Sequence, residues 1–182
     1  MGMALNWKFC HAAATGQLDV AIQAAQEGVD VRVYDYWAFR WACRGGHLAV
    51  AAWLADRGGG GDFNTTLQWA CELGQFDIIV WMSTRFGLSR DNVCSDNNRA
   101  LQLACAGGHL AVARWLAQTF GLEAADAKSR DNLALHLACA NGHLDVVQWL
   151  FATFGLTPRE DDVRVENYSE AVTKWLRETI RE

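Results

Sequence analysis

The chain has 182 residues, of which 51% are hydrophobic, and its formal net charge is −5 at pH 7. The acidic balance and the lack of a Lys/Arg-rich run argue against a nucleic-acid backbone or an anionic membrane as the main partner. No apolar run has the length of a membrane-spanning helix, and no signal peptide opens the sequence. We therefore expect a cytoplasmic protein in a reducing compartment.

One short pattern recurs five times along the chain. Residues 100–110 have the sequence ALQLACAGGHL, and residues 134–144 have the sequence ALHLACANGHL. A fixed period of about this size is typical of arrays of repeated supersecondary structure. The central alanine of the pattern recurs at intervals of 28 to 34 residues, at Ala12, Ala42, Ala70, Ala104 and Ala138.

The first two repeats cover about residues 5–28 and 36–57. In the first, apolar residues at helical spacing on both sides of Gly16 predict two short helices separated by a turn. Residues 29–36, which lead into the second repeat, alternate between apolar and polar side chains and predict an extended finger. The glycine run at residues 58–61 then predicts a flexible connector.

The remaining repeats cover about residues 64–86, 97–120 and 131–154, and each ends in Phe-Gly-Leu. A polar stretch after each of them predicts one further helical turn. The last stretch begins with residues 157–160 (TPRE), where Thr at the N-cap, Pro at the first helical position and Glu three beyond the cap predict a helix start. Residues 169–176 keep the spacing of a second helix with a charged exterior and lack a first helix, so residues 157–182 predict a C-terminal cap. We expect an all-α solenoid of five helix pairs plus this capping helix, in a single domain over residues 1–182.

The repeat resembles the ankyrin repeat. Residues 135–147 (LHLACANGHLDVV) stand where an ankyrin repeat has Leu-His-x-Ala-Ala-x-x-Gly-His-Leu-x-Val-Val, and residues 27–31 (EGVDV) resemble the Gly-Ala-Asp-Val that leads into an ankyrin finger. The likeness covers about residues 6–154, although the Thr-Pro that opens the ankyrin first helix is absent. These departures make the chain similar to the divergent ankyrin arrays of large DNA viruses and protists.

The resemblance implies a non-enzymatic adaptor that binds a protein partner on the elongated face formed by first helices and connectors. A rigid repeat surface favours the same function, because little ordering is needed on binding. We predict no catalytic residue, no metal, no cofactor, no nucleic-acid partner, no membrane partner, and a monomer. The alternatives are a structural or engineered scaffold without a natural ligand, and a Cys-based redox or metal-responsive protein.

Cysteine occupies one repeat position four times. Equivalent residues of stacked helices lie about 8–10 Å apart, which is too far for a disulfide or for shared zinc ligands, and no Cys-x-x-Cys occurs. A small buried residue in a reducing compartment is therefore the favoured interpretation. The four cysteines are Cys43, Cys71, Cys105 and Cys139.

The residue after the turn glycine is His in three repeats and Gln in two. Gln can form the same kind of hydrogen bond to the backbone but does not titrate, so a structural role at the turn is favoured over proton or metal chemistry. A recurring Trp in the second helix predicts packing between repeats rather than ligand stacking. The turn residues are Gln17, His47, Gln75, His109 and His143, and the tryptophans are Trp53, Trp81, Trp115, Trp149 and Trp175.

The candidate partner-binding residues are the variable positions beside these fixed ones. Aromatic side chains in the predicted finger serve either as binding anchors or as packing residues, and variable polar residues serve either as partner contacts or as plain solvated surface. The finger residues are Tyr34, Tyr36 and Trp37. The variable helix positions are Arg40, Gln68, Gln102 and His136, and those before the turn glycine are Arg44, Glu72, Leu73 and Asn141.

Overall fold

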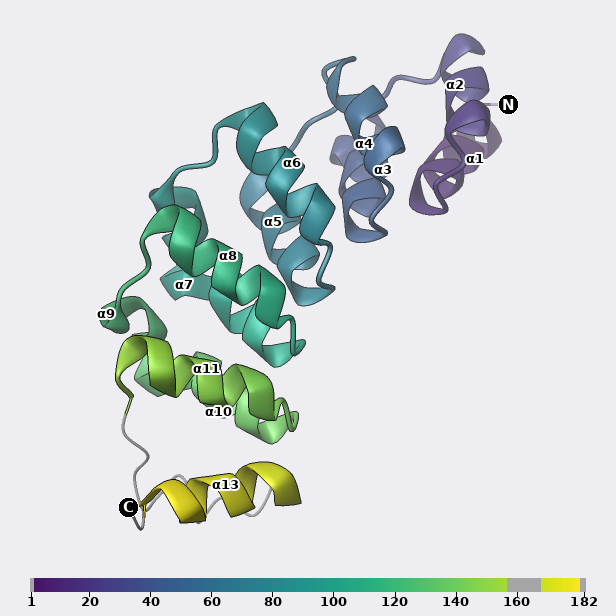
Figure 1. The fold of residues 1–182 in the computed structure, drawn as a ribbon. Coiled ribbons are helices and arrows are strands. Elements are labelled where there is room, and N and C mark those ends of the chain that lie inside the picture. Colours follow the sequence, from purple (N-terminus) through teal and green to yellow (C-terminus); the bar gives the residue numbers. More distant parts are fainter. Residues whose placement is uncertain (1, 157–167, 181–182) are drawn as a thin grey trace. The chain divides into compact units, whose positions relative to one another are not determined.

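The computed structural model describes residues 2–156 and 168–180, and these residues form helices and no strand (Figure 1). The five predicted helix pairs are confirmed, as is the additional helix at the C-terminal end. The first helices of the pairs are α1 (Gly2–Ala14), α3 (Val33–Arg44), α5 (Phe63–Glu72), α7 (Arg90–Ala106) and α10 (Ser129–Ala140). The second helices are α2 (Leu18–Gln26), α4 (Leu48–Ala55), α6 (Phe76–Phe86), α8 (Leu110–Phe120) and α11 (Leu144–Phe154), and α9 (Ala124–Ala127) and α13 (Glu170–Ile180) complete the set.

The chain divides into two compact units. The N-terminal unit comprises Met1–Ala70 and Gln75–Gly87, and the C-terminal unit comprises Cys71–Gly74 and Leu88–Glu182. Within the N-terminal unit, α1 packs on α2 and α3, α3 packs on α4, and α2 packs on α4. Within the C-terminal unit, α7 packs on α8 and α10, α10 packs on α11, and α11 packs on α8 and α13. In each unit, first helices therefore contact first helices and second helices contact second helices. The single domain over residues 1–182 stays a prediction.

Small residues in the first helices form the most buried layer of the core. The five repeated alanines are at most 1% exposed, and a small residue next to each of them is equally buried. A small side chain lets neighbouring helices approach closely, so this layer explains why the pattern recurs. The neighbouring residues are Ala13, Cys43, Cys71, Cys105 and Cys139, and none of these four cysteines is in a disulfide within the described residues.

Glycine forms the turn inside each helix pair, as predicted. The second residue of each of these turns has a φ angle between +67° and +79°, a left-handed conformation that is costly for residues with a Cβ atom. The chain can therefore reverse between two helices without a longer loop. These glycines are Gly16, Gly46, Gly74, Gly108 and Gly142.

The predicted helical turns after Phe-Gly-Leu are confirmed in two places. After the third repeat, Ser89 caps the start of α7 in a reciprocal capping box with Asn92. After the fourth repeat, Glu123 and Asp126 make the same kind of box at α9. The third such stretch, residues 157–160, lies outside the described residues.

The predicted extended finger at residues 29–36 is wrong. Tyr34, Asp35 and Tyr36 have left-handed backbone angles, with φ between +52° and +58°. The same conformation recurs at residues 96–98 and 130–132, at the same distance before the central alanine of their repeats. We call these three segments the left-handed turns. Each of them leads directly into the right-handed part of a first helix.

Candidate functional site

From the second repeat onward, the side chain after the turn glycine reaches back to the preceding repeat. In these four repeats a ring or amide nitrogen lies 2.9 to 3.1 Å from a backbone oxygen at the end of the previous first helix. The predicted structural role is confirmed, because these side chains are used in joining repeats. The pairs are His47 Nε2 with Ala14 O, Gln75 Nε2 with Arg44 O, His109 Nε2 with Glu72 O, and His143 Nε2 with Ala106 O.

Two of the five recurring tryptophans pack on an aromatic ring of the preceding repeat, as predicted, whereas Trp115 and Trp149 pack on Phe120 and Phe154 of their own helices. The ring of Trp81 lies 6.4 Å from that of Phe39 in the preceding repeat, and the ring of Trp175 lies 5.2 Å from that of Phe151. Trp149 is only 8% exposed. Trp53 differs from these, because Arg57 lies over its ring at 4.3 Å. These contacts account for the recurrence of tryptophan at this position without a stacked ligand.

The three aromatic residues around the first left-handed turn have different surroundings. Tyr34 is 53% exposed, which leaves its ring available to a partner. Tyr36 is half-buried and packs closely against the backbone of Gly61. Trp37 is half-buried too, and its ring centroid lies 5.0 Å from that of Trp41.

Arg40 and Arg44 both lie on α3 but have different partners. Arg40 forms an ion pair with Asp35 at 3.5 Å, and its side chain is 20% exposed. The guanidinium of Arg44 lies over two indole rings, 5.0 Å from Trp41 and 5.6 Å from Trp69. A cation above an indole ring is attracted by its negative face, so this stacking holds the Arg44 side chain in place.

Trp41 and Trp69 are the functional candidates that sequence reasoning missed. They occupy one repeat position, directly before the central alanine, and His11 takes the same position in the first repeat. Both indole rings are half-buried, and their centroids lie 6.5 Å apart. A comparison of repeats at this position would have found them, because the corresponding residues of the last two repeats are Leu103 and Leu137.

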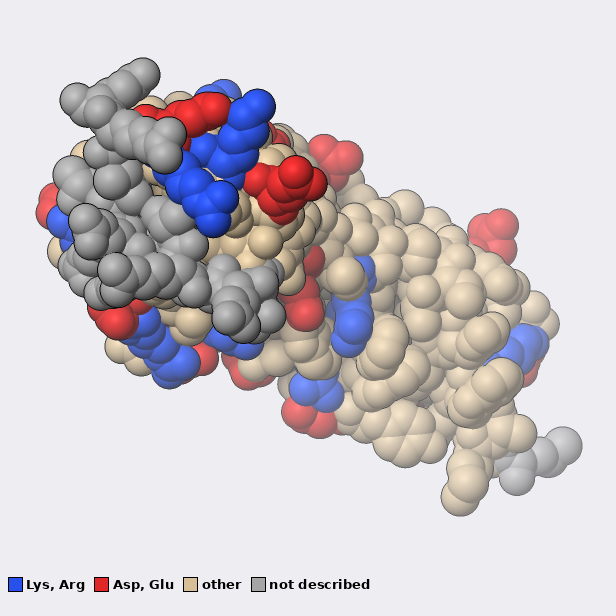
Figure 2. Space-filling model, turned by 90° about the horizontal axis from the view of Figure 1, so that it is seen from below, with Lys and Arg blue, Asp and Glu red and all other residues tan. Residues whose placement is uncertain are grey.

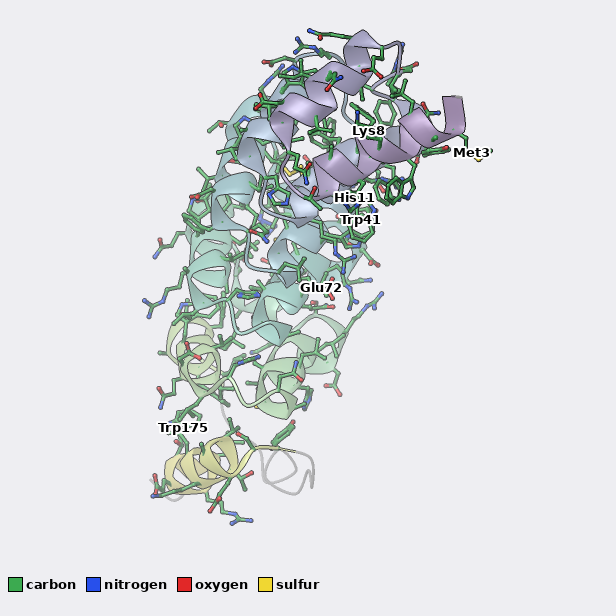
Figure 3. The ribbon with its side chains drawn as sticks, turned by 90° about the vertical axis from the view of Figure 1, so that its right-hand side faces the viewer. Met3, Lys8, His11, Trp41, Glu72 and Trp175 are labelled. Carbon is green, nitrogen blue, oxygen red and sulfur yellow. The ribbon has the colours of Figure 1, made fainter. Side chains whose placement is uncertain are left out.

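Trp7 and His11 extend this surface along α1. Their rings are stacked, with centroids 4.9 Å apart and planes 5° apart, and Trp7 is 66% exposed. Figure 3 shows His11 and Trp41 close together on the same side of the first helices. We call this surface of the N-terminal unit the aromatic–arginine strip, and it comprises Trp7, His11, Trp37, Trp41, Arg44 and Trp69.

Gln102 is not exposed, which corrects the expectation that this position lies on the surface. Its side chain is completely buried, and Nε2 donates to the Asn97 backbone oxygen at 2.7 Å and to Ser129 Oγ at 3.4 Å. The Asn97 backbone oxygen also accepts a hydrogen bond from Ser129 Oγ at 2.9 Å, so two side-chain donors hold the left-handed turn at residues 96–98. The variable residue at this position therefore stabilises the turn.

The other candidates lie at or near the surface. Leu73 is 41% exposed, Glu72 and Asn141 are exposed, and Gln68 is half-buried. Asn141 also has a structural contact, since its Nδ2 donates to the backbone oxygen of Ala106 at 2.7 Å. His136 is half-buried, with Nδ1 2.7 Å from the hydroxyl oxygen of Tyr168.

Burial controls the chemistry of the cysteines. It raises the pKa of Cys43, Cys71 and Cys105 far above that of a free thiol, and it raises the pKa of Cys10 to about 11.

Within residues 2–156 and 168–180, His, Cys, Asp and Glu do not gather in groups of three that could hold a metal ion. Of the helices described, none is both long and apolar enough to cross a bilayer.

Comparison with known proteins gives one family. A family model described as ankyrin repeats, in three copies, matches residues 67–161, which is more than half of the chain. The chain belongs to the ankyrin-repeat family. No curated protein matches its sequence. The likeness to ankyrin arrays of large DNA viruses and protists stays a prediction.

The matched segment covers the third, fourth and fifth ankyrin repeats. The first two repeats lie outside it but have the same helix–glycine–helix order and the same buried alanine. In place of the ankyrin finger, three repeats have a left-handed turn. Ankyrin repeats are typically protein–protein interaction modules and are usually non-catalytic. The aromatic–arginine strip lies on the first helices α1, α3 and α5 of this array.

Proposed function

We propose that this chain is a non-enzymatic adaptor that binds a protein partner through exposed residues of its first helices and left-handed turns. The observation that carries the proposal is the aromatic–arginine strip, in which large rings and a cation remain partly open to solvent. Trp and Arg are enriched among the residues that dominate binding energy in protein interfaces. The position of the Arg44 guanidinium over Trp41 and Trp69 already restrains its side chain, so less side-chain entropy is lost when a partner binds.

The chemistry of the cysteines supports the adaptor over a redox protein. Reactive cysteines are exposed and have a lowered pKa, whereas burial raises the pKa of Cys71 and Cys105. Free buried thiols also favour a reducing compartment, so we propose a cytoplasmic location. We further propose that the chain is a monomer, and sedimentation velocity tests this directly.

A capture experiment tests the adaptor function. The full chain is immobilised and exposed to lysate of the source cells, and proteins enriched over an unrelated ankyrin-repeat chain are purified for direct titration. We expect the double variant Arg44→Glu/Trp69→Ser to bind the captured protein at least tenfold more weakly than the native chain.

The matched control is Arg57→Glu/Trp53→Ser. This pair also has an arginine over a tryptophan in the N-terminal unit, but it lies on and just after the second helix α4. We expect the control to bind like the native chain, and the melting curves of both variants show whether they are folded. Equal loss in both variants would contradict a site on the first helices, and the capture of no specific protein would contradict the adaptor function.

A further inference from the structure

The charge on the N-terminal unit is unevenly distributed. In total this unit has six Lys and Arg residues and seven Asp and Glu residues. Its first-helix segments, residues 2–14, 33–44 and 63–70, have three basic residues and one acidic residue. Glu72, the last residue of α5, adds a second acidic residue, so α1, α3 and α5 together have a net charge of +1 in a chain whose net charge is −5. The charged residues of the three segments are Lys8, Arg40, Arg44 and Asp35.

Arg44 is the arginine of this face that an incoming anion would meet. No described carboxylate forms an ion pair with it, whereas Arg40 on the same helix is paired with Asp35. Its guanidinium is held by its position over Trp41 and Trp69. A guanidinium fixed in this way still has N–H groups with which to donate two parallel hydrogen bonds to a carboxylate.

The surface around Arg44 is apolar rather than broadly charged. Trp37 and Trp41 lie side by side on α3, and Trp7 is stacked on His11 on α1. In Figure 2, the right-hand end of the molecule, where the N-terminal helices lie, has few charged side chains on the face shown. A fitting ligand would therefore have apolar side chains next to a negative one.

We propose that the aromatic–arginine strip binds an acidic segment of a partner protein. In this complex an Asp or Glu side chain pairs with Arg44, and a neighbouring apolar side chain packs on Trp41 and Trp69. The proposal rests on the proposed adaptor function and specifies the kind of partner. A protein segment fits better than a nucleic acid, since one unpaired arginine and one lysine are too few to neutralise a phosphate backbone.

A random peptide library tests this chemistry without knowledge of the partner. Twelve-residue peptides displayed on phage are selected on the full-length native chain, and the selected peptides are sequenced and synthesised. We expect Asp or Glu next to Leu, Phe, Trp or Tyr to be enriched over the unselected library. In titrations of a selected peptide, replacing its acidic residues with Asn or Gln should weaken binding at least tenfold.

Variants of the chain locate the site. We expect Arg44→Gln to weaken peptide binding at least tenfold, Arg44→Lys to weaken it less, and Trp69→Leu to weaken it at least tenfold. The matched control Arg57→Gln removes the cation above Trp53 and should leave peptide binding unchanged. Neutralising the peptide's own charges gives a second measurement that does not depend on how well any variant folds.

Several outcomes would overturn the inference. They are the enrichment of no peptide, the enrichment of peptides without acidic residues, and equal weakening by Arg44→Gln and Arg57→Gln. Binding of a mixed-sequence 20-nucleotide single-stranded DNA in 150 mM salt that Arg44→Gln abolishes would replace the acidic peptide with a nucleic acid. If a lysate protein is captured and lost with Arg44→Glu/Trp69→Ser while the selected peptides are not acidic, the adaptor function stands and this inference alone fails.

Discussion

The imidazole of His47 is hydrogen-bonded to the backbone oxygen of Ala14, with 3.0 Å between Nε2 and the oxygen. Ala14 is the last residue of α1, where helix geometry leaves carbonyl groups without an intrahelical partner. A carbonyl oxygen can only accept, so Nε2 of His47 is the nitrogen that has the proton. Gln75 forms the equivalent bond to Arg44 with an amide. Each of these bonds therefore joins a repeat to the one before it.

This bond makes His47 a test of how the repeats are joined. We expect His47→Ala to lower the free energy of unfolding by about 1–2 kcal/mol, because a partly buried carbonyl loses its donor. His47→Gln should cost less than half as much, since an amide N–H can donate to the same oxygen. Urea denaturation followed by circular dichroism measures both. A Gln variant as damaged as the Ala variant would show that the imidazole matters for its packing rather than for its hydrogen bond.

The His or Gln that joins each repeat to the one before it also lies against the turn glycine of that preceding repeat, and leaves no room there for a Cβ atom. The pair Gly108 and His143 shows this. Gly108 has φ +72°, and a Cβ atom added there would collide with the imidazole of His143. Gly121 has φ +60°, and an added Cβ atom would meet no atom within 4 Å. Gly121→Ala should therefore cost only the left-handed backbone penalty of about 1–2 kcal/mol.

We expect Gly108→Ala to cost at least about 1 kcal/mol more than Gly121→Ala, because the collision adds to the same backbone penalty. Parallel urea titrations of the two variants measure this difference. Equal losses would mean that His143 moves aside freely and that its bond to Ala106 contributes little.

The helix pairs could be predicted from the sequence because their determinants are local and repeated. The buried alanine, the turn glycine and the His or Gln after it recur in five repeats, so each repeat supports the assignment of the others. The hydrogen-bonding role of His47 also followed from its exchange with Gln. Its partner Ala14 did not, because that residue lies in another repeat and is brought close only by stacking.

The left-handed turn at residues 34–36 was missed because the short-range alternation of residues 29–36 resembles a strand. Asp30 accepts a hydrogen bond from the backbone N–H of Arg32 and so turns the chain just before Tyr34. The burial of Gln102 was missed for a related reason. Its amide donates to the backbone oxygen of Asn97, a residue of the left-handed turn that the sequence did not predict. A residue type that varies between repeats at this position can therefore reflect a difference in the turn before it rather than exposure to solvent.

The left-handed turns predict where glycine would stabilise the fold. Asp131 is exposed and has φ +55°. Glycine adopts this conformation without steric penalty, so Asp131→Gly should raise the free energy of unfolding by about 0.5–1 kcal/mol. Asp145 is exposed in the first turn of α11, a right-handed helix, where Asp145→Gly should lower it by about 0.5–1 kcal/mol. Thermal denaturation of both variants gives the comparison, and destabilisation by Asp131→Gly would contradict the left-handed conformation.

The buried thiols predict a loss of stability at alkaline pH. Burial raises the pKa of Cys105 above its usual value of 9.0, so the folded chain keeps this proton at a pH where the unfolded chain has lost it. The unfolded state then binds fewer protons than the folded state, and stability falls as pH rises above about 9. The free energy of unfolding should fall by up to about 1.4 kcal/mol per pH unit for each such cysteine.

Cys105→Ala isolates this contribution, because alanine is also small and apolar and loses no proton. Urea titrations at pH 8, 9 and 10 should give the variant a shallower fall in the free energy of unfolding than the native chain. Cys94→Ala is the comparison at a thiol that is less buried and lies beside Asp126, and it should change the slope less. Native and Cys105→Ala chains with the same slope would mean that the Cys105 thiol ionises as readily in the folded chain as in the unfolded one. Because deprotonation would place a charge among apolar side chains, that outcome would require the first-helix core to open to water.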